Sequence, residues 1–209
     1  MTTPKKTIYL IRHGQTDYNL RGIVQGSGLD SVLNEKGHHQ ANLFHQAYRN
    51  IPFDKIYVSE LQRTHQSVEP FKKDGYSLTT LSELNEINWG ILEGQEPTPE
   101  RYQHFLSISK RWRNGDYHAA CENGESAQSM FDRQKKALEI ILNSNDSTIL
   151  ICMHGRAIRS FLCLLTDTPL SQMDNFGHEN LCLYILEQKI DQPEIFDIKL
   201  SNCINHLNS

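Results

Sequence analysis

Two histidines in this sequence occupy matching positions, each between an apolar run and a glycine. His13 follows the run Thr7–Ile11, with Arg12 in between, and His154 directly follows the run Thr148–Met153. Short apolar runs rich in β-branched residues predict strands that are buried on both faces. If both strands belong to one parallel sheet, the two imidazoles meet beyond the carboxyl ends of the strands, where ligands of open α/β sheets bind.

Two further apolar runs lead to charged side chains. Lys55–Val58 predicts a second strand along the chain, and Arg63 follows it within the next predicted helix. Ser77–Leu81 predicts a third strand, followed by a segment that holds Glu83 and Glu86. A parallel arrangement therefore brings two histidines, several arginines and a carboxylate into one crevice.

Phosphoryl transfer is the chemistry that these side chains suit. A neutral imidazole attacks phosphorus in line, and arginines bind the equatorial oxygens through planar, bidentate donors. The positive charge of the arginines also favours the neutral, nucleophilic form of a histidine. A carboxylic acid supplies the proton that the departing alkoxide needs. Because cationic side chains can stabilise the transition state, this chemistry requires no metal ion.

The elements expected around these residues alternate between strands and helices. Two more strands are expected at Leu181–Leu186 and Glu194–Leu200, paired as an antiparallel hairpin around Asp191–Pro193. Helices are expected from Asn34 to about Arg49, from Ser59 to about Lys72, from Glu125–Ser126 to about Asn143, and from about Gly155 to Leu165. This alternation predicts a single domain over residues 1–209, an α/β fold in which helices cover both faces of a mostly parallel central sheet, a three-layer α/β/α sandwich.

Two segments interrupt that alternation. Residues 14–30 are rich in glycine and predict turns. The segment of about 91–123 holds Pro97, Pro99 and a helix-like stretch, Arg101–Trp112, and we interpret it as a small lid-like insertion. The basic and aromatic run Lys110–Arg113 falls in that stretch and is too short to indicate nucleic-acid binding.

Composition and charge restrict the class of protein. The chain has 209 residues, enough for a substantial core, and its net charge of −4 argues against a general nucleic-acid binder. No window approaches the ~20 apolar residues of a membrane span, and the polar N-terminus, Met1–Lys6, lacks the apolar stretch of a signal peptide. We therefore expect a cytoplasmic protein without nucleic-acid or membrane partners, while its oligomeric state stays open.

Ligand-binding motifs of other kinds are missing from the sequence. The five cysteines have no C-x-x-C spacing, and no H-E-x-x-H motif occurs, so we expect free buried thiols and no metal site. No G-x-x-x-x-G-K-[ST] motif occurs, so a nucleotide-binding P-loop is not expected.

Several different short motifs follow one another along nearly the whole chain. Leu10–Thr16 contains Arg-His-Gly-Gln-Thr, and His154-Gly155 forms a second His-Gly pair. The others are Asn19 with Gln25-Gly26, Leu33–Ala41, Ser59–Arg63, Leu84–Glu86 with Gly90 and Glu93-Gly94, and Gly124–Ser126. Together they resemble the motifs of the histidine phosphatase superfamily, also called the phosphoglycerate mutase-like family. One tripeptide is weak evidence, but seven motifs in the right order are strong.

The resemblance implies a role for each matched residue. His13 would be the nucleophile, and Glu86 rather than Glu83 would be the proton donor, because Glu86 holds the family position after Leu-Asn. Glu86 could instead be a helix cap or a salt-bridge partner. The phosphate pocket would consist of Arg12, Arg63 and His154, supported by Asn19 and the backbone of Gly155. Further candidates for substrate binding are Gln25, Gly26, Arg21 and Arg156.

The sequence departs from the family pattern in two places. The family commonly has an arginine where this chain has Ile23, and here the arginine is Arg21. A small residue usually follows the second His-Gly, where this chain has Arg156. A cation in the first turn of a helix is unfavourable. Arg156 therefore either pairs with a lid carboxylate such as Glu93 or Glu96, or binds a second anionic group of the substrate, which is the hypothesis we favour.

The expected function is metal-independent hydrolysis of a phosphomonoester through a phosphohistidine, with a small, anionic phosphorylated metabolite as substrate and no cofactor. A cofactor-dependent phosphoglycerate mutase is the alternative, with 2,3-bisphosphoglycerate as its priming phosphate donor. A mutase must shield its intermediate from water, and the short lid of this chain favours the phosphatase. A non-catalytic phospho-ligand binding module is the third hypothesis, which Glu86 disfavours, since binding alone needs no proton donor.

Overall fold

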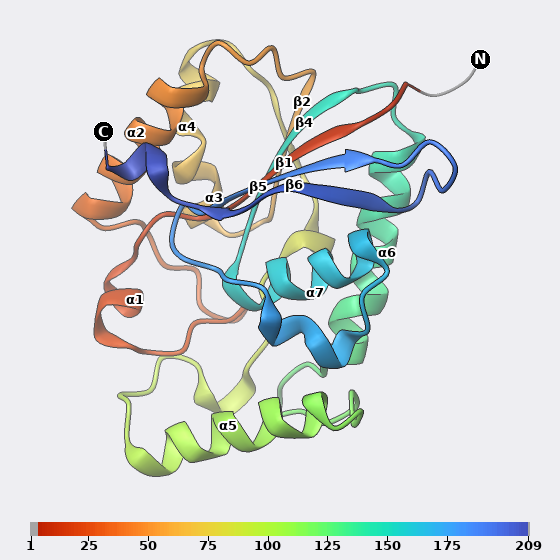
Figure 1. Cartoon of the computed structure of the whole chain (residues 1–209). Coiled ribbons are helices and arrows are strands. Elements are labelled where there is room, and N and C mark those ends of the chain that lie inside the picture. The colour runs from red at the N-terminus through yellow and green to blue at the C-terminus, as the bar shows by residue number, and fades with distance from the viewer. Residues whose placement is uncertain (1–3, 209) are drawn as a thin grey trace.

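The apolar runs of the sequence form one six-stranded sheet in the computed structural model, which describes residues 4–208 (Figure 1). The strands are β1 (Thr7–Arg12), β2 (Lys55–Val58), β3 (Leu78–Thr80), β4 (Thr148–Met153), β5 (Leu183–Gln188) and β6 (Phe196–Cys203), and their order in the sheet is β3-β2-β4-β1-β5-β6. Residues 1–3, which begin the polar N-terminal stretch, and residue 209 lie outside the described part.

Four neighbouring strands of the sheet run parallel. β1 pairs with β4, β4 with β2, and β2 with β3, all in parallel, which confirms the mostly parallel sheet. β5 and β6 form the expected antiparallel hairpin. β5 also pairs antiparallel with β1, with Leu183 opposite Ile11. Residues that precede β5 therefore lie beside residues that follow β1.

Side chains of the central strands alternate between the two faces of the sheet, and both faces are covered. Ile149, Ile151 and Met153 of β4 join one apolar cluster, while Leu150 and Cys152 join the other. All five side chains are fully buried. Burial on both faces explains why this strand reads as an uninterrupted apolar run.

Helices form the two outer layers (Figure 1). One face is covered by α2 (Glu35–Tyr48), α3 (Gln62–Ser67) and α4 (Glu69–Lys73), and the other by α6 (Ala127–Asn143) and α7 (Gly155–Thr166). Asn34 caps α2 and Ser126 caps α6, as the sequence predicts. The 3-10 helices are η1 (Ser82–Leu84), η2 (Gly90–Leu92), η3 (Leu170–Asn175) and η4 (Asn205–Leu207).

The single helix predicted from Ser59 to about Lys72 is wrong, because the structure has two helices, α3 and α4, that meet at Val68. Pro70 has no N–H for the carbonyl four residues earlier, and its ring would clash with that carbonyl, so one helix cannot run through it. Pro70 lies instead in the first turn of α4. Leu61 occupies the N-cap position of α3, and the Ser59 side chain makes other contacts described below.

The glycine-rich segment 14–30 contains a short helix as well as the predicted turns. This helix, α1 (Asp17–Arg21), begins with a capping box in which the Thr16 side chain accepts from the Asn19 N–H and the Asn19 side chain accepts from the Thr16 N–H. Gly22 ends it in the left-handed region at φ 68°. The helix presents Asn19 to the region beyond β1.

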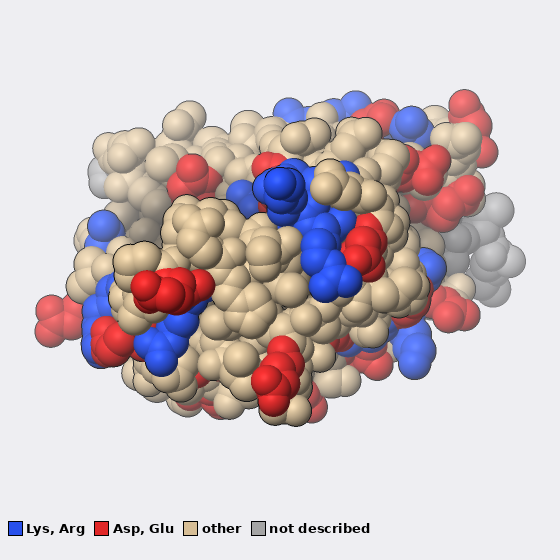
Figure 2. Space-filling view, turned by 90° about the horizontal axis from the view of Figure 1, so that it is seen from below, with Lys and Arg blue, Asp and Glu red and all other residues tan. Residues whose placement is uncertain are grey.

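The segment predicted as a lid-like insertion contains α5 (Pro99–Arg113), which lies apart from the two helical layers (Figure 1). Ile108 and Trp112 of α5 are buried against the main core, so the helix is firmly packed. Its action as a lid stays a prediction. Seen from the α5 side, charged side chains of both signs lie in small groups on a largely uncharged face (Figure 2). In the described chain, no helix has the length and apolar character needed to cross a membrane.

Candidate active site

His13 comes directly after β1 and is buried. Its backbone N–H donates to the carbonyl oxygen of Met153 (2.9 Å), which extends the pairing of β1 with β4 and sets its position. Its Nδ1 lies 2.7 Å from the carbonyl oxygen of Gly14, and since a carbonyl only accepts, Nδ1 carries the proton. The other ring nitrogen, Nε2, then keeps its lone pair and is the nucleophilic atom of the neutral ring.

The surroundings of His13 keep its imidazole neutral. Burial and the positive charges of Arg63 and Arg12 lower the pKa of His13 well below its ordinary value. The hydrogen bond with Gly14 opposes this effect and does not overcome it. The ring is therefore in its nucleophilic form at neutral pH.

Arg12 ends β1 and presents an unused donor. Its Nη1 donates to the carbonyl oxygen of His178 (2.6 Å), whereas its Nε is buried without a hydrogen-bond partner among the described residues. Buried donors are nearly always bonded, so this N–H is a candidate donor to a bound ligand. A Cβ on Gly155 would lie 3.4 Å from Arg12 Nε and 2.8 Å from the His178 ring, so glycine lets the start of α7 approach both.

Arg63 and His154 form a fully buried pair. Nε of Arg63 donates to Nδ1 of His154 (3.2 Å), so the proton of His154 is on Nε2, which donates to Oγ of Ser59 (2.7 Å). Burial and the neighbouring Arg63 lower the pKa of His154 well below its ordinary value. The rings of His154 and His13 are 5.2 Å apart between centroids. Both ring nitrogens of His154 are thus hydrogen-bonded to other side chains, and the residue orients Arg63.

The guanidinium of Arg63 is further held by backbone. Nη1 donates to the carbonyl of Leu29 (2.9 Å) and Nη2 to that of Gly26 (3.2 Å). Burial lowers the pKa of Arg63 to about 10, which leaves it charged at neutral pH. Arg63 therefore supplies a fixed positive charge next to His13, and Gly26 serves the site through its carbonyl.

Asn19 and Gln25 both line the cavity beside His13. Oδ1 of Asn19 accepts from the backbone N–H of Thr16 (3.2 Å) and from Nδ2 of Asn180 (3.1 Å), which leaves its NH2 group for a ligand. Nε2 of Gln25 donates to Oγ1 of Thr16 (2.7 Å) and Oε1 accepts from Ser31 (2.5 Å). Gln25 thus mainly fixes Thr16, the N-cap residue of the helix α1 that carries Asn19.

Glu86 lines the same cavity and caps α7. Its Oε1 accepts from the backbone N–H groups of Ala157 (2.8 Å) and Ile87 (2.9 Å), and its Oε2 accepts from that of Arg156 (2.9 Å). The residue is only 6% exposed. Glu86 therefore caps α7 in this structure, and its role as the proton donor stays a prediction. Glu86 thus occupies the N–H groups of Arg156 and Ala157 at a helix end that would otherwise attract an anionic ligand.

Arg156, in the first turn of α7, pairs with neither Glu93 nor Glu96. Its Nη1 donates to Oδ1 of Asp174 in η3 (2.5 Å). Its guanidinium lies 5.5–5.8 Å from the ring centroids of Trp89, Phe105 and Trp112. The less favoured alternative, pairing with a lid carboxylate, is thus wrong, because η3 packs against α7 and brings Asp174 closer. Arg156 still lines the cavity.

Arg21, at the end of α1, does not line the cavity. It forms an ion pair with Glu96, and more than half of each of these two side chains is exposed. The structure therefore does not bring Arg21 together with the other predicted substrate-binding residues. Ile23, which replaces the arginine of the family pattern, does line the cavity with an apolar side chain.

The cavity has a volume of about 170 Å³. This is small beside the roughly 300–1,000 Å³ of sites for drug-sized ligands, so it suits a small metabolite. Its lining combines Arg12, His13, Asn19, Gln25, Glu86, Gly155, Arg156 and His178 with the apolar Ile23, Val24, Trp89 and Phe105. Because Phe105 belongs to α5, the predicted lid-like segment forms part of the wall.

Two residues of the site, His178 and Asn180, were not singled out from the sequence. His178 lines the cavity, and Asn180 donates from Nδ2 to the carbonyl of His13 (3.0 Å). Both precede β5, and the pairing of β5 with β1 brings them next to His13. Their position just before a strand was a possible signal, because residues before an antiparallel strand can lie at the edge of the sheet where ligands bind. The sequence does not show, however, which strand β5 joins.

Donor groups for a metal ion are sparse in the described residues. Over residues 4–208, no group of three or more His, Cys, Asp or Glu side chains is arranged to hold a metal ion. The five cysteines are free thiols, as expected, and all but Cys203 are buried.

Comparison with known proteins places this geometry in a family. Residues 8–200 match the histidine phosphatase superfamily (branch 1). Phosphoserine phosphatase 1 of Hydrogenobacter thermophilus is 27% identical over 198 residues, covering 93% of this chain and 92% of that protein. A Yersinia pestis protein named probable phosphoglycerate mutase GpmB is 34% identical over 167 residues, covering 78% of this chain and 75% of that protein.

A solved structure shares the fold. The alpha-ribazole phosphatase of Shigella flexneri superposes with a TM-score of 0.81 at 24% identity, over 94% of this chain and 96% of that one. The two relatives are thus named a phosphatase and a probable mutase, and the family match spans every motif from His13 to His154. The chain belongs to the histidine phosphatase superfamily and is an enzyme of that family.

Proposed function

We propose that this protein hydrolyses a phosphomonoester through a phosphohistidine on His13. The neutral Nε2 of His13 attacks phosphorus, and the ester P–O bond breaks while a P–N bond forms. Protonated Glu86 gives its proton to the departing alkoxide. Water then attacks phosphorus with loss of a proton to Glu86, the P–N bond breaks, and inorganic phosphate leaves the restored enzyme.

The observation that carries this proposal is the state of His13. Its Nδ1–H is bound to the Gly14 carbonyl, and the nearby arginines and burial lower its pKa. A histidine that served only as a cation or a structural donor would need neither feature. Both features favour a free electron pair on Nε2 within the cavity.

The phosphate-binding part of the proposal rests on donors that meet at the start of α7. Arg12 offers its unpaired Nε, and the backbone N–H groups of Arg156 and Ala157 are occupied by the Glu86 carboxylate. A phosphate that binds here competes with that carboxylate for the same donors.

We propose that the substrate is a small phosphorylated metabolite with a second anionic group. Asp174 is the carboxylate partner of Arg113 (2.9 Å), Arg156 (2.5 Å) and Arg159 (3.0 Å), so positive charge exceeds negative charge in this cluster. Of these arginines, Arg156 lines the cavity. A carboxylate or second phosphate of the substrate would balance the excess charge at Arg156.

The proposal assigns no step to a metal ion or an organic cofactor. Arg12, Arg63 and the N-terminus of α7 supply the positive charge that stabilises a transferring phosphoryl group. Arg12 and Arg63 act on His13 through their charge, and Gly155 at the start of α7 lies close to Arg12.

A phosphoglycerate mutase is the second candidate, favoured by the 34% identity to the protein named GpmB. It would pass the phosphoryl group from His13 to a bound phosphoglycerate instead of water, and it would need 2,3-bisphosphoglycerate as a priming donor. Product analysis with 3-phosphoglycerate, with and without 2,3-bisphosphoglycerate, separates the two. Inorganic phosphate identifies the phosphatase, and 2-phosphoglycerate identifies the mutase.

Chemical trapping tests the intermediate. Enzyme quenched in alkali during turnover should keep a labelled phosphoryl group, and enzyme quenched in acid should lose it, because phosphohistidine is acid-labile. His13→Ala should abolish the label and lower kcat by roughly 10³-fold or more. His38→Ala, on the exposed side of α2, is the control and should change neither. A label that survives acid, as phosphoserine does, would rule the mechanism out.

A further inference from the structure

Glu86 lies in a segment that has no regular structure of its own. Residues 85–89, between η1 and η2, belong to no helix or strand. Such a segment lacks the repeating backbone hydrogen bonds that hold a strand or a helix in place. Other groups must therefore hold the backbone that carries the Glu86 carboxylate.

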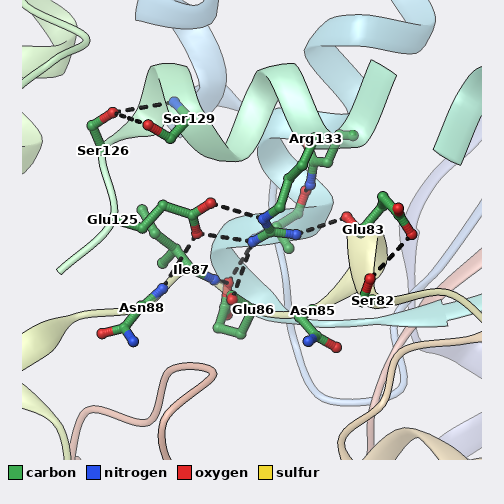
Figure 3. A network of polar contacts seen from close by, with 12 residues as sticks. Ser82, Glu83, Asn85, Glu86, Ile87, Asn88, Glu125, Ser126, Ser129 and Arg133 are labelled. Carbon is green, nitrogen blue, oxygen red and sulfur yellow. Dashed lines mark hydrogen bonds and ion pairs between the residues drawn. The ribbon is translucent and has the colours of Figure 1, made fainter. Parts of the chain in front are cut away.

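Arg133 of α6 holds this backbone from one side. Its Nη1 donates to the carbonyl oxygen of Glu83 (2.7 Å), and its Nη2 donates to that of Glu86 (3.2 Å) (Figure 3). One guanidinium thus bridges two carbonyl groups three residues apart. The rigid, planar fork of an arginine transmits its own position to both.

Glu125 fixes Arg133 in turn. Its Oε1 accepts from Nε of Arg133 (2.8 Å) and its Oε2 from Nη2 (3.0 Å), a bidentate pair in which each side chain is about 20% exposed (Figure 3). Glu125 also bonds to Asn88 on the far side of Glu86, through its own backbone N–H to the Asn88 carbonyl (2.7 Å). The Arg133–Glu125 pair is therefore hydrogen-bonded to the chain both before Glu86, at Glu83, and after it, at Asn88.

Close backbone packing restricts the end of the segment. Gly90 has φ +54°, and a Cβ there would lie 2.0 Å from the carbonyl oxygen of Glu122. The backbone N–H of Ile91 donates to that same carbonyl (3.1 Å). Only glycine permits both the backbone conformation and the approach. The segment 85–90 is thus pressed against residues 121–125.

These contacts also account for the Gly124–Ser126 motif, to which the phosphoryl chemistry assigns no role. Gly124 lies against the segment, since a Cβ there would be 2.9 Å from the Asn88 carbonyl oxygen. Glu125 holds Arg133, and Ser126 begins α6 by accepting from the backbone N–H of Ser129 (3.1 Å) (Figure 3). The motif joins the start of α6 to the segment that bears Glu86.

We propose that Arg133, oriented by Glu125, is the positioning residue for the proton donor Glu86, an inference that rests on the proposed function. Arg133 and Glu125 do not line the cavity of His13. They line a second, polar cavity of about 440 Å³, to which Glu86 also contributes. The contacts through which they reach the His13 cavity are those with the backbone that carries Glu86, besides a small effect of the Arg133 charge on His154. A displacement of about 1 Å is enough to cost roughly 100-fold in rate, so this support controls proton donation.

The double variant Arg133→Met/Glu125→Gln tests the proposal without leaving one charge unpaired. Its kcat should fall roughly 10- to 100-fold on glycerol phosphate, whose alkoxide needs a proton, and much less on p-nitrophenyl phosphate, whose phenolate leaves unaided. Lys135→Met, on the exposed side of the same helix, is the control and should change neither value. Combined with Glu86→Gln, the double variant should cause no further loss on glycerol phosphate.

Equal losses on both substrates, or losses that add to those of Glu86→Gln, would overturn the inference. Arg133→Lys serves where the double variant does not fold, since it keeps the charge and loses the planar fork. Alkaline trapping separates this inference from the proposed function. Absence of phosphohistidine in the wild type counts against the proposed function, whereas its presence together with equal losses counts against Arg133 alone.

Discussion

The proposed nucleophile, His13, and the proposed acid, Glu86, are held by different parts of the structure, called here the nucleophile end and the acid end of the site. At the nucleophile end, His13 and His154 directly follow β1 and β4, and the register of the sheet decides that their rings meet. At the acid end, Glu86 lies in an irregular segment held by Arg133 and Glu125. The nucleophile is therefore placed by the fold as a whole, whereas the acid is placed by a few side chains that can be changed separately.

The balance of charge also differs between the two ends. Arg12 and Arg63 place positive charge around His13, and this charge lowers its pKa. At the acid end, Arg133 is paired with Glu125 and is neutral as a unit. The nucleophile end thus carries the positive charge that an anion needs, whereas the charges at the acid end cancel and serve to position the backbone.

Removing the acid should give the largest difference between the two ends. Glu86→Gln should lower kcat on alkyl phosphates by roughly 10²–10⁴-fold, because their leaving groups need a proton. The loss on p-nitrophenyl phosphate should be small, since the nucleophile end is intact and phenolate needs no proton. Steady-state kinetics with both substrates measure this ratio. Glu83→Gln is the matched control, and equal loss on both substrates in Glu86→Gln would transfer the role to Glu83.

A smaller effect on the kinetics than that of Glu86→Gln is expected from replacing Arg156, which lines the same cavity as His13 and Glu86. Arg156→Ala should raise KM for phosphoserine or 3-phosphoglycerate by roughly 10-fold, since a hydrogen bond to a charged group contributes about 1.5–3 kcal/mol. KM for p-nitrophenyl phosphate, which has no second anion, should hardly change. Arg159→Ala removes an arginine that shares Asp174 but does not line the cavity, and it should leave both KM values near those of the wild type. Parallel changes on both substrates would show that Arg156 serves the transferred phosphate instead.

The excess positive charge of the nucleophile end should also appear in the pH dependence of stability. Burial and the charges of Arg12, Arg159 and Arg156 lower the pKa of His178 to about 3. The unfolded chain, with an ordinary histidine pKa of about 6.5, binds this proton first, so the free energy of unfolding falls as pH decreases between these values.

His178→Asn should remove this contribution. The slope of unfolding free energy against pH, measured by urea denaturation between about pH 6 and pH 4, should become shallower by up to about 1.4 kcal/mol per pH unit, the value for one proton. The backbone carbonyl that holds Arg12 is retained in this variant. Identical slopes in the two proteins would show that His178 is protonated in the folded state.

The smallest expected effect is that of a chelator. If the arginines and the start of α7 supply the charge that the phosphoryl group requires, excess EDTA should leave kcat unchanged on both kinds of substrate. Loss of activity in EDTA that is restored by Mg²⁺ would contradict the metal-independent mechanism.

Local signals in the sequence were enough to predict the strands, though not their full order in the sheet, and the meeting of His13 with His154. Buried strands such as β4 appear as apolar runs, and Asn34 and Ser126 mark helix starts through their capping chemistry. Parallel strands place their carboxyl ends at one edge, so the positions of His13 and His154 follow from the order of elements. The break of the helix at Pro70 was also readable, and the prediction missed it.

Only the tertiary structure decided which charged side chains pair. The sequence offers 25 carboxylates, and nothing local distinguishes Asp174 from Glu93 or Glu96 as the partner of Arg156. The same holds for the pairing of β5 with β1, which brings His178 to the site, and for the contact of Arg133 with the segment of Glu86. These contacts join residues far apart in the chain, and their distances are set by how the helices and the sheet pack, a property of the whole core rather than of any segment.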